Sequence, residues 1–396
     1  MSESKCIILR TKNILVPTMD NLGSFIKEKA FNLPSDDIEL IEAELSTRER
    51  RDLRRDPRVR AIAPPMPLKL INPVEKKDID MGILSSSTWG IQAVRASESP
   101  YDGSGITVAI LDTGIDSTHP AFNGISLVQR NFTSEEDADI HGHGTHCAGT
   151  IFGRDVEGIR IGVAQGVNRA VIGKVLGDGG GSSATIAQAI QWAISERANI
   201  ISMSLGIDFP GYVDLLVNTY GYDINPVTSM ALEAYRQNIN LFTELARFVE
   251  TQSAFGDGIV IVAASGNESK RPDYEIAVAP PAAGTGIIAV GALGEVDTGF
   301  KEATFSNNQV DVSAPGVGVV SAALGGGLTS MSGTSMATPH VAGIAALWAQ
   351  RQRKMNGSVE SRSLIAQIIA SGTTDTLEPN IEEEDVGTGI VQAPHS

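Results

Sequence analysis

Short apolar runs alternate with longer amphipathic stretches along most of this chain. The apolar runs have the length and β-branched content of buried strands: GITVAILD at 105–112, ISLVQRNF at 125–132, AVIGKVL at 170–176, NIISMSLG at 199–206, GIVIVAASGN at 258–267 and GIIAVGAL at 286–293. Helical periodicity begins at His143, at Ser183 and at Ser335. Strands that alternate with helices form βαβ crossovers. The pattern therefore predicts an α/β fold, a doubly wound, mainly parallel sheet with helices on both faces.

The first 80 residues carry a different pattern. A strand at 5–11, a helix around 21–31, a strand at 38–45 and a helix opened by Ser46 or Thr47 predict a small α+β domain over 1–80. The next run, RVRAIAPPMPLKLI at 58–71, contains three prolines, which exclude a helix and should confine any strand to a sheet edge. A polar, Ser-rich stretch follows, and we expect a linker at 81–88.

The α/β pattern occupies residues 89–396 and is interrupted once. The segment 207–256 separates two consecutive core strands and is longer than an ordinary crossover. Its periodicity predicts a helix from Thr228 to Glu250. We interpret the segment as a crossover helix enlarged by an insertion.

Composition and charge exclude two classes of partner. The formal net charge is −16, whereas a phosphate-binding surface needs a local excess of Lys and Arg. The arginines at 48–60 are interrupted by Glu49, Asp52 and Asp56, as on a solvated helix. No apolar run has the length of a membrane span. We therefore expect neither a nucleic-acid nor a membrane partner.

The cysteines and the N-terminus bear on location. Two cysteines, Cys6 and Cys147, stand in unlike contexts and predict no disulfide framework. The apolar stretch at 6–9 is shorter than the core of a secretory signal. These features favour the cytoplasm over secretion, with export by a non-Sec route as the alternative.

Three motifs carry candidate chemistry: DTGID at 112–116, HGTHCAG at 143–149 and GTSMATPHVAG at 333–343. A serine hydroxyl is a weak nucleophile near neutral pH, so a base such as His143 must take the proton of Ser335 and later return it to the leaving amine. An acid such as Asp112 holds the imidazole tautomer and stabilises the imidazolium. Asn267, where a strand ends in Ser-Gly-Asn, is a candidate donor to the oxyanion beside the Ser335 N–H.

With these motifs in this order, the chain from about residue 89 to 393 resembles the subtilase family of serine peptidases, and Cys147 resembles the free cysteine of its proteinase-K-like branch. The resemblance implies a subtilisin-like fold and an Asp112–His143–Ser335 triad. It also implies an endopeptidase that binds protein or peptide substrates as an added strand between Lys174–Gly179, which includes Gly177, and Ser204–Gly206. The pocket for the residue before the scissile bond would be walled by small residues and favour apolar side chains; these residues are Ser204, Leu205, Gly206, Ala264, Ser265 and Gly266.

The N-terminal domain resembles a subtilase propeptide, a chaperone that also inhibits the enzyme. The resemblance implies a zymogen whose own N-terminal domain is its intramolecular inhibitor, with self-cleavage near Leu84–Ser85. The sequence differs from the family at its common calcium site, because Ala121 and Val156 stand where oxygen ligands are expected. We expect that site to be absent and cannot place another calcium site from the sequence.

Two alternatives are open at this stage. Cys147 is a second candidate nucleophile, although a buried cysteine without a thiolate-stabilising partner is usually inert. A scaffold that binds peptides without cleaving them is the alternative that involves no catalysis, and a zymogen held shut by its N-terminal residues would behave in the same way until processed.

Overall fold

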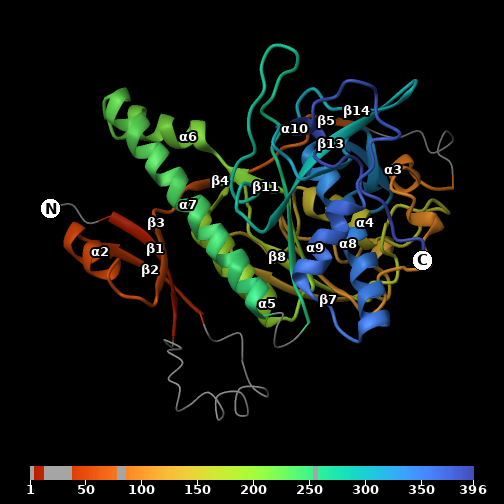
Figure 1. The fold of residues 1–396 in the computed structure, drawn as a ribbon, viewed down its shortest axis with the longest axis horizontal. Coiled ribbons are helices and arrows are strands. Elements are labelled where there is room, and N and C mark those ends of the chain that lie inside the picture. Colours follow the sequence, from red (N-terminus) through yellow and green to blue (C-terminus); the bar gives the residue numbers. More distant parts are fainter. Residues whose placement is uncertain (1–3, 13–37, 78–85, 253–256) are drawn as a thin grey trace, which may run out of the picture.

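The computed structural model describes residues 4–12, 38–77, 86–252 and 257–396. Within them a small N-terminal sheet precedes a larger α/β body (Figure 1). The helix expected around 21–31 and the cleavage site expected at Leu84–Ser85 lie outside the described residues.

The body is built on an eight-stranded sheet. Its strands pair in the order β14-β13-β12-β10-β6-β8-β7, and β15 also pairs with β13. Every pairing is parallel except that of β13 with β14. The strands are β6 (Thr107–Asp112), β7 (Ser126–Asn131), β8 (Arg169–Lys174), β10 (Ile200–Met203), β12 (Val260–Ala264), β13 (Ile287–Val296), β14 (Gly299–Glu302) and β15 (Val312–Pro315). The mainly parallel α/β sheet predicted from the sequence is confirmed.

Alternate side chains of the strands enter two different cores. Val108 and Ile110 of β6 pack in one core, while Ala109 and Leu111 pack in the other. Neighbouring residues of a strand point to opposite faces, so each face needs a covering layer. The first core is covered by α4 (His143–Phe152), α8 (Thr334–Asn356) and α9 (Ser361–Ala370), and the second by α5 (Ser183–Ser195) and α7 (Ile224–Gln252) (Figure 1).

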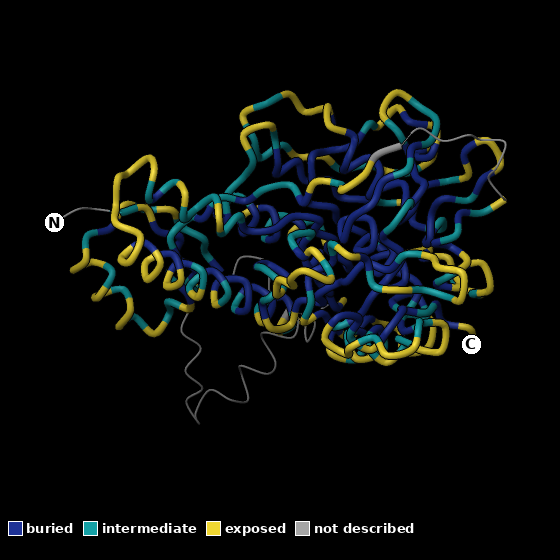
Figure 2. Tube along the Cα trace, turned by 90° about the horizontal axis from the view of Figure 1, so that it is seen from above, coloured by how far each residue is buried: buried dark blue, intermediate teal, exposed yellow. Residues whose placement is uncertain are grey.

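The N-terminal sheet lies against the α5–α7 side of the body. β1 (Ser4–Thr11) pairs antiparallel with both β2 (Ile38–Leu45) and β3 (Val59–Ala63). Ile7 and Leu9 belong to the core formed by α5 and α7, whereas Cys6 and Ile8 pack beneath α2 (Thr47–Leu53). Ser46 caps α2 through Glu49, and no residue of α2 is buried (Figure 2). This sheet therefore shares apolar contacts with the body instead of standing apart from it.

Two short strands connect the N-terminal sheet to the body. β4 (Pro67–Leu70) lies between β11 (Leu205–Ile207) and β9 (Gly181–Ser182) and is antiparallel to both. The expectation that proline would confine any strand of 58–71 to a sheet edge is confirmed for β3, an edge strand, and is wrong for β4. Pro67 is the first residue of β4, a position that strands tolerate, and its carbonyl accepts a hydrogen bond from the Asp208 N–H. β5 (Glu75–Lys77) pairs antiparallel with β17 (Leu328–Ser332), which also pairs with β16 (Val319–Ala322).

The segment 207–256 forms a helical hairpin over its described residues. α6 (Phe209–Asp214) leads into a π-helical turn, η6 (Leu215–Thr219), and then into α7, which begins at Ile224 and not at Thr228 as expected. The Asn238 amide on α7 donates to the Pro64 carbonyl at 3.0 Å, so the hairpin also supports the N-terminal unit. The remaining short elements are α3 (Trp89–Ala93), η4 (Ala96–Glu98), η5 (Pro120–Phe122) and α10 (Glu383–Val386). Among the described helices, none combines the length and apolarity needed to cross a bilayer.

Candidate active site

The structure brings the three predicted catalytic side chains to one edge of the sheet. Asp112 is the last residue of β6, His143 is the first residue of α4, and Ser335 lies in the first turn of α8. All three are buried. This edge is where the carboxyl ends of parallel strands meet, so groups from distant segments can converge there.

Asp112 and His143 form a direct ion-pairing contact. Nδ1 of His143 lies 2.7 Å from Oδ1 of Asp112, and the same oxygen accepts from the Thr113 N–H at 2.7 Å. Burial alone would lower the pKa of His143, but the adjacent Asp112 carboxylate outweighs it and holds that pKa well above 6.5. Nε2 of His143 is buried and has no hydrogen-bond partner. The nitrogen that must accept a proton from a nucleophile is thus unengaged.

Asp139 organises the turn that leads into the histidine helix. Its carboxylate accepts hydrogen bonds from the backbone N–H groups of His141, Gly142 and Thr145 and from two hydroxyls, those of Thr113 and Thr145. The sequence analysis missed this residue. The signal available was an acid four residues before His143 in a glycine-rich turn, a pattern also typical of exposed loops.

A proline in α8 frees the backbone carbonyl of Ser335. Pro339 has no N–H to donate to the residue four positions earlier, which is Ser335. The Ser335 carbonyl instead accepts from the Ser204 hydroxyl at 3.2 Å and from the Cys147 thiol at 3.4 Å. Two neighbouring segments thereby fix the first turn of α8.

The amide of Asn267 is held in one orientation. Its Oδ1 accepts from both the N–H and the hydroxyl of Thr334, each at 2.9 Å, so Nδ2 is left to donate into the site. Nδ2 donates to the Asn72 carbonyl at 3.1 Å. Asn267 therefore already acts as a donor to a carbonyl oxygen beside Ser335, and Thr334 is a second residue that sequence reasoning missed.

The segment that contains β4 and β5 passes directly over these groups. The Ser335 hydroxyl donates to the Ile71 carbonyl at 3.0 Å. The Val74 N–H then donates to the Ser332 carbonyl at 2.7 Å, and β5 continues along β17. Backbone carbonyls of this segment thus accept hydrogen bonds from both Ser335 and the amide of Asn267.

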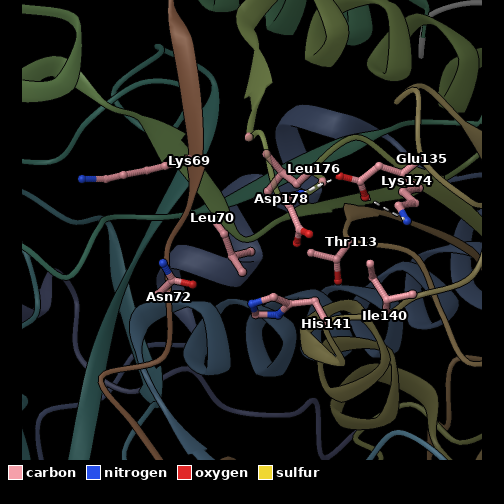
Figure 3. Close-up of a pocket in the computed structure, with 12 residues that line it drawn as sticks. Lys69, Leu70, Asn72, Thr113, Glu135, Ile140, His141, Lys174, Leu176 and Asp178 are labelled. Carbon is pink, nitrogen blue, oxygen red and sulfur yellow. Dashed lines mark hydrogen bonds and ion pairs between the residues drawn. The ribbon is translucent and has the colours of Figure 1, made fainter. Parts of the chain in front are cut away.

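The groove around this segment differs in part from expectation. The pairing edge opposite β11 is β9, Gly181–Ser182, and not a strand within Lys174–Gly179. Lys174 is the last residue of β8 in the central sheet, and both Lys174 and Gly177 line a cavity of about 230 Å³ beside Leu70. Figure 3 shows Leu70, Thr113, His141 and Leu176 around this cavity.

The buried Ile71 side chain lies beside Gly206, one of the residues expected to form the small-residue pocket. Ile71 is only 3% exposed, and a Cβ atom added to Gly206 would lie 3.6 Å from its Cδ1. A Cβ atom at position 206 would therefore make an ordinary van der Waals contact with this side chain. Ser204, Leu205, Ala264 and Ser265 are also buried.

A comparison with known protein families identifies the family of this chain. The model of the subtilase family of peptidases (peptidase S8) matches residues 103–389, most of the chain. The chain belongs to the subtilase family.

Several subtilases of known activity are similar to this chain over most of its length. A thermostable alkaline protease of Halalkalibacterium halodurans is 34% identical over 79% of this chain and 73% of its own. An intracellular serine protease of Paenibacillus polymyxa is 33% identical over 70% and 78%, and subtilisin E of Bacillus subtilis is 34% identical over 69% and 64%. This protein is a subtilisin-like serine endopeptidase that acts on proteins.

Two places in this subtilase bear on metal binding. Ala121 and Val156, which the sequence analysis compared with calcium ligands, are both buried and carry no side-chain oxygen. In the described part of the chain, one group of side chains is close enough to chelate an ion: Asp112, His143 and Cys147. Burial raises the pKa of the Cys147 thiol, which opposes both metal ligation and nucleophilic attack, since each needs the thiolate.

Proposed function

We propose that this subtilase hydrolyses peptide bonds through the triad Asp112, His143 and Ser335 and an acyl-enzyme, and that its N-terminal residues hold it as a zymogen. The observation that carries the proposal is the pair of contacts at the nucleophile. His143 and Asp112 are already joined at 2.7 Å, while the Ser335 hydroxyl donates to Ile71 and leaves Nε2 of His143 without a partner.

Catalysis follows from this geometry once a substrate replaces residues 67–77. Nε2 of His143 accepts the proton of Ser335 as Oγ attacks the carbonyl carbon. Asp112 stabilises the imidazolium, and Asn267 Nδ2 together with the Ser335 N–H stabilises the tetrahedral oxyanion. His143 then returns the proton to the leaving amine, and water attacks the acyl-enzyme by the same route.

The pocket favours an apolar residue before the scissile bond. The residues expected to wall it are uncharged, and the buried Ile71 side chain lies beside one of them, Gly206. We therefore expect broad cleavage after residues such as Leu, Phe and Met, with most of the binding provided by main-chain pairing to β11 and β9.

The closed form is inhibited because the peptide group after Ile71 is not aligned with the oxyanion donor, while β4 keeps the pairing with β11 expected of a substrate. The Ile71 carbonyl is the nearest to Oγ of Ser335, but the Asn267 amide donates to the next carbonyl, that of Asn72. The bond nearest the nucleophile therefore lacks this oxyanion donor, and the segment blocks the groove while resisting attack. The apolar contacts of the N-terminal sheet with α5 and α7 hold the segment in place.

An active-site probe tests this proposal. A fluorophosphonate should label Ser335 slowly in the intact chain and rapidly after N-terminal processing, and Ser335→Ala should not be labelled. N-terminal sequencing of incubated protein should show a new end between residues 70 and 90, which would separate a cut after Ile71 from one near Leu84. Absence of labelling after processing would refute the triad, and absence of a new end would refute self-processing.

A further inference from the structure

The register of β4 assigns a place in the groove to Lys69. Lys69 pairs with Gly206, and Leu70 and Ile71 follow it. Because the Ile71 carbonyl lies on the Ser335 hydroxyl, Ile71 occupies the position before the bond nearest the nucleophile. Lys69 therefore occupies the third position before that bond, counting Ile71 as the first.

Two carboxylates of the peptidase body contact the Lys69 ammonium. Nζ lies 3.2 Å from Oδ1 of Asp208 and 3.3 Å from Oε1 of Glu268. Asp208 begins the 207–256 hairpin, and Glu268 follows the oxyanion residue Asn267. Burial alone would lower the pKa of Lys69, but the two carboxylates outweigh it and raise that pKa. Lys69 is among the residues that line the cavity beside Leu70, but Figure 3 shows its ammonium pointing away from Leu70.

Both carboxylates are positioned without the lysine. Asp208 caps α6, and its Oδ1 accepts from the Gly211 N–H at 3.2 Å. A Cβ atom at Gly211 would lie 2.1 Å from Oδ2 of Asp208, so the carboxylate packs directly against this glycine. Oε2 of Glu268 accepts from the Asn307 amide at 2.8 Å. The acidic pair is thus set by the body of the enzyme and stays when β4 leaves.

Lys69 is the one cation that pairs with either carboxylate within the ranges that the structure describes. When a substrate replaces β4, the pair faces the groove with no lysine or arginine of those ranges beside it. We propose that Asp208 and Glu268 form an acidic subsite that selects Lys or Arg at the third position before the scissile bond of protein substrates. The inference rests on the proposed function, since it takes the register of the closed segment as that of a substrate.

The size of the preference follows from the exposure of the pair. The side chains of Asp208, Glu268 and Lys69 are 30, 34 and 38% exposed, so solvent screens each contact. An ion pair at such a site contributes at most about a factor of five. We expect kcat/KM to be about fivefold higher for Lys than for Gln at the third position, and lower still for Glu. The preference should shrink at about 1 M salt, where the screening length is about 3 Å.

Three matched peptides test the subsite. The full-length chain is first incubated until its rate of peptide hydrolysis is constant. The peptides share an apolar residue before the scissile bond and differ only in Lys, Gln or Glu at the third position; kcat/KM is measured for each. The double variant Asp208→Asn with Glu268→Gln keeps the shapes and acceptor oxygens and should lose the order Lys over Gln over Glu. The control variant Glu98→Gln with Asp375→Asn removes the same amount of charge from exposed positions. It should keep the order Lys over Gln over Glu.

The outcomes separate this inference from the proposed function. Equal kcat/KM for the three peptides, or a preference that survives in the double variant, would overturn the subsite and leave the peptidase mechanism intact. If none of the three peptides is cleaved, the proposed function is refuted, and the subsite is refuted with it.

Discussion

The contacts of residues 67–77 lead to one quantitative prediction, for the variant Ile71→Ala. In the structure, Ile71 is buried over Gly206 and its carbonyl accepts the hydrogen bond from Ser335. The substitution keeps this carbonyl and removes only the side chain beyond Cβ. It should weaken the hold of residues 67–77 on the groove and leave the triad untouched.

The magnitude follows from the area that the side chain buries. Ile71→Ala deletes the three carbon atoms beyond Cβ, at about 0.8 kcal/mol for each buried carbon. The open state of the segment should therefore become more favourable by about 2.4 kcal/mol, which corresponds to about a 50-fold larger open fraction. Water can enter the vacated groove, so we add no cavity penalty.

The rate of fluorophosphonate labelling at Ser335 measures this open fraction. Labelling in the intact chain requires opening, so Ile71→Ala should be labelled about 50 times faster than the unmodified chain. Intact mass at each time point excludes molecules that have already been cut. The matched control is Val74→Ala in the same segment, because Val74 is 56% exposed and its backbone contact to Ser332 is unaffected. It should change the rate less than about twofold.

Two results would refute this reasoning. Equal labelling of Ile71→Ala and the unmodified chain would mean that the side chain does not hold the segment closed. Equal acceleration by Val74→Ala would mean that any truncation loosens the chain. Circular dichroism and the melting temperature should show that both variants stay folded, so that a slow rate cannot be attributed to an unfolded site.

Three further predictions concern the catalytic groups. Asn267→Ala should lower kcat of the processed enzyme by about 10² to 10³ with little change in KM, a magnitude taken from the corresponding donor of subtilisin and not worked out from this structure; an unchanged kcat would remove Asn267 from the mechanism. Cys147→Ala should keep peptide hydrolysis and lower the free energy of unfolding by about 1 kcal/mol through the lost thiol contact to Ser335, whereas loss of activity in the folded variant would restore the cysteine as a candidate nucleophile. His143 must be neutral to accept a proton and Asp112 raises its pKa, so kcat/KM should fall as pH drops through a value above 6.5; an acid limb below 6.5 in a pH profile would contradict the Asp112–His143 pairing.

Local pattern was sufficient to propose the triad and to predict most of the fold. Each residue of the proposed triad lies inside a short motif at the junction of a strand or helix, so the proposal depends on neighbours that are close in the chain. The strand at 107–112 and the helix at 334–356 follow from periodicity and breakers in the same way. The family resemblance added the order of the motifs, which no single motif contains.

Only the tertiary structure decided which backbone carbonyl accepts the hydrogen bond from Ser335. Nothing in the sequence distinguishes Ile71 from Leu84 as the residue nearest Ser335, because the register of β4 depends on pairing with Leu205–Ile207, far along the chain. The same holds for the contacts of Asp139 and for the acidic pair Asp208 and Glu268, whose partners come from other segments. Strand pairing and side-chain contacts between distant segments are set by the packed fold, and a one-residue shift would reverse every side chain of β4.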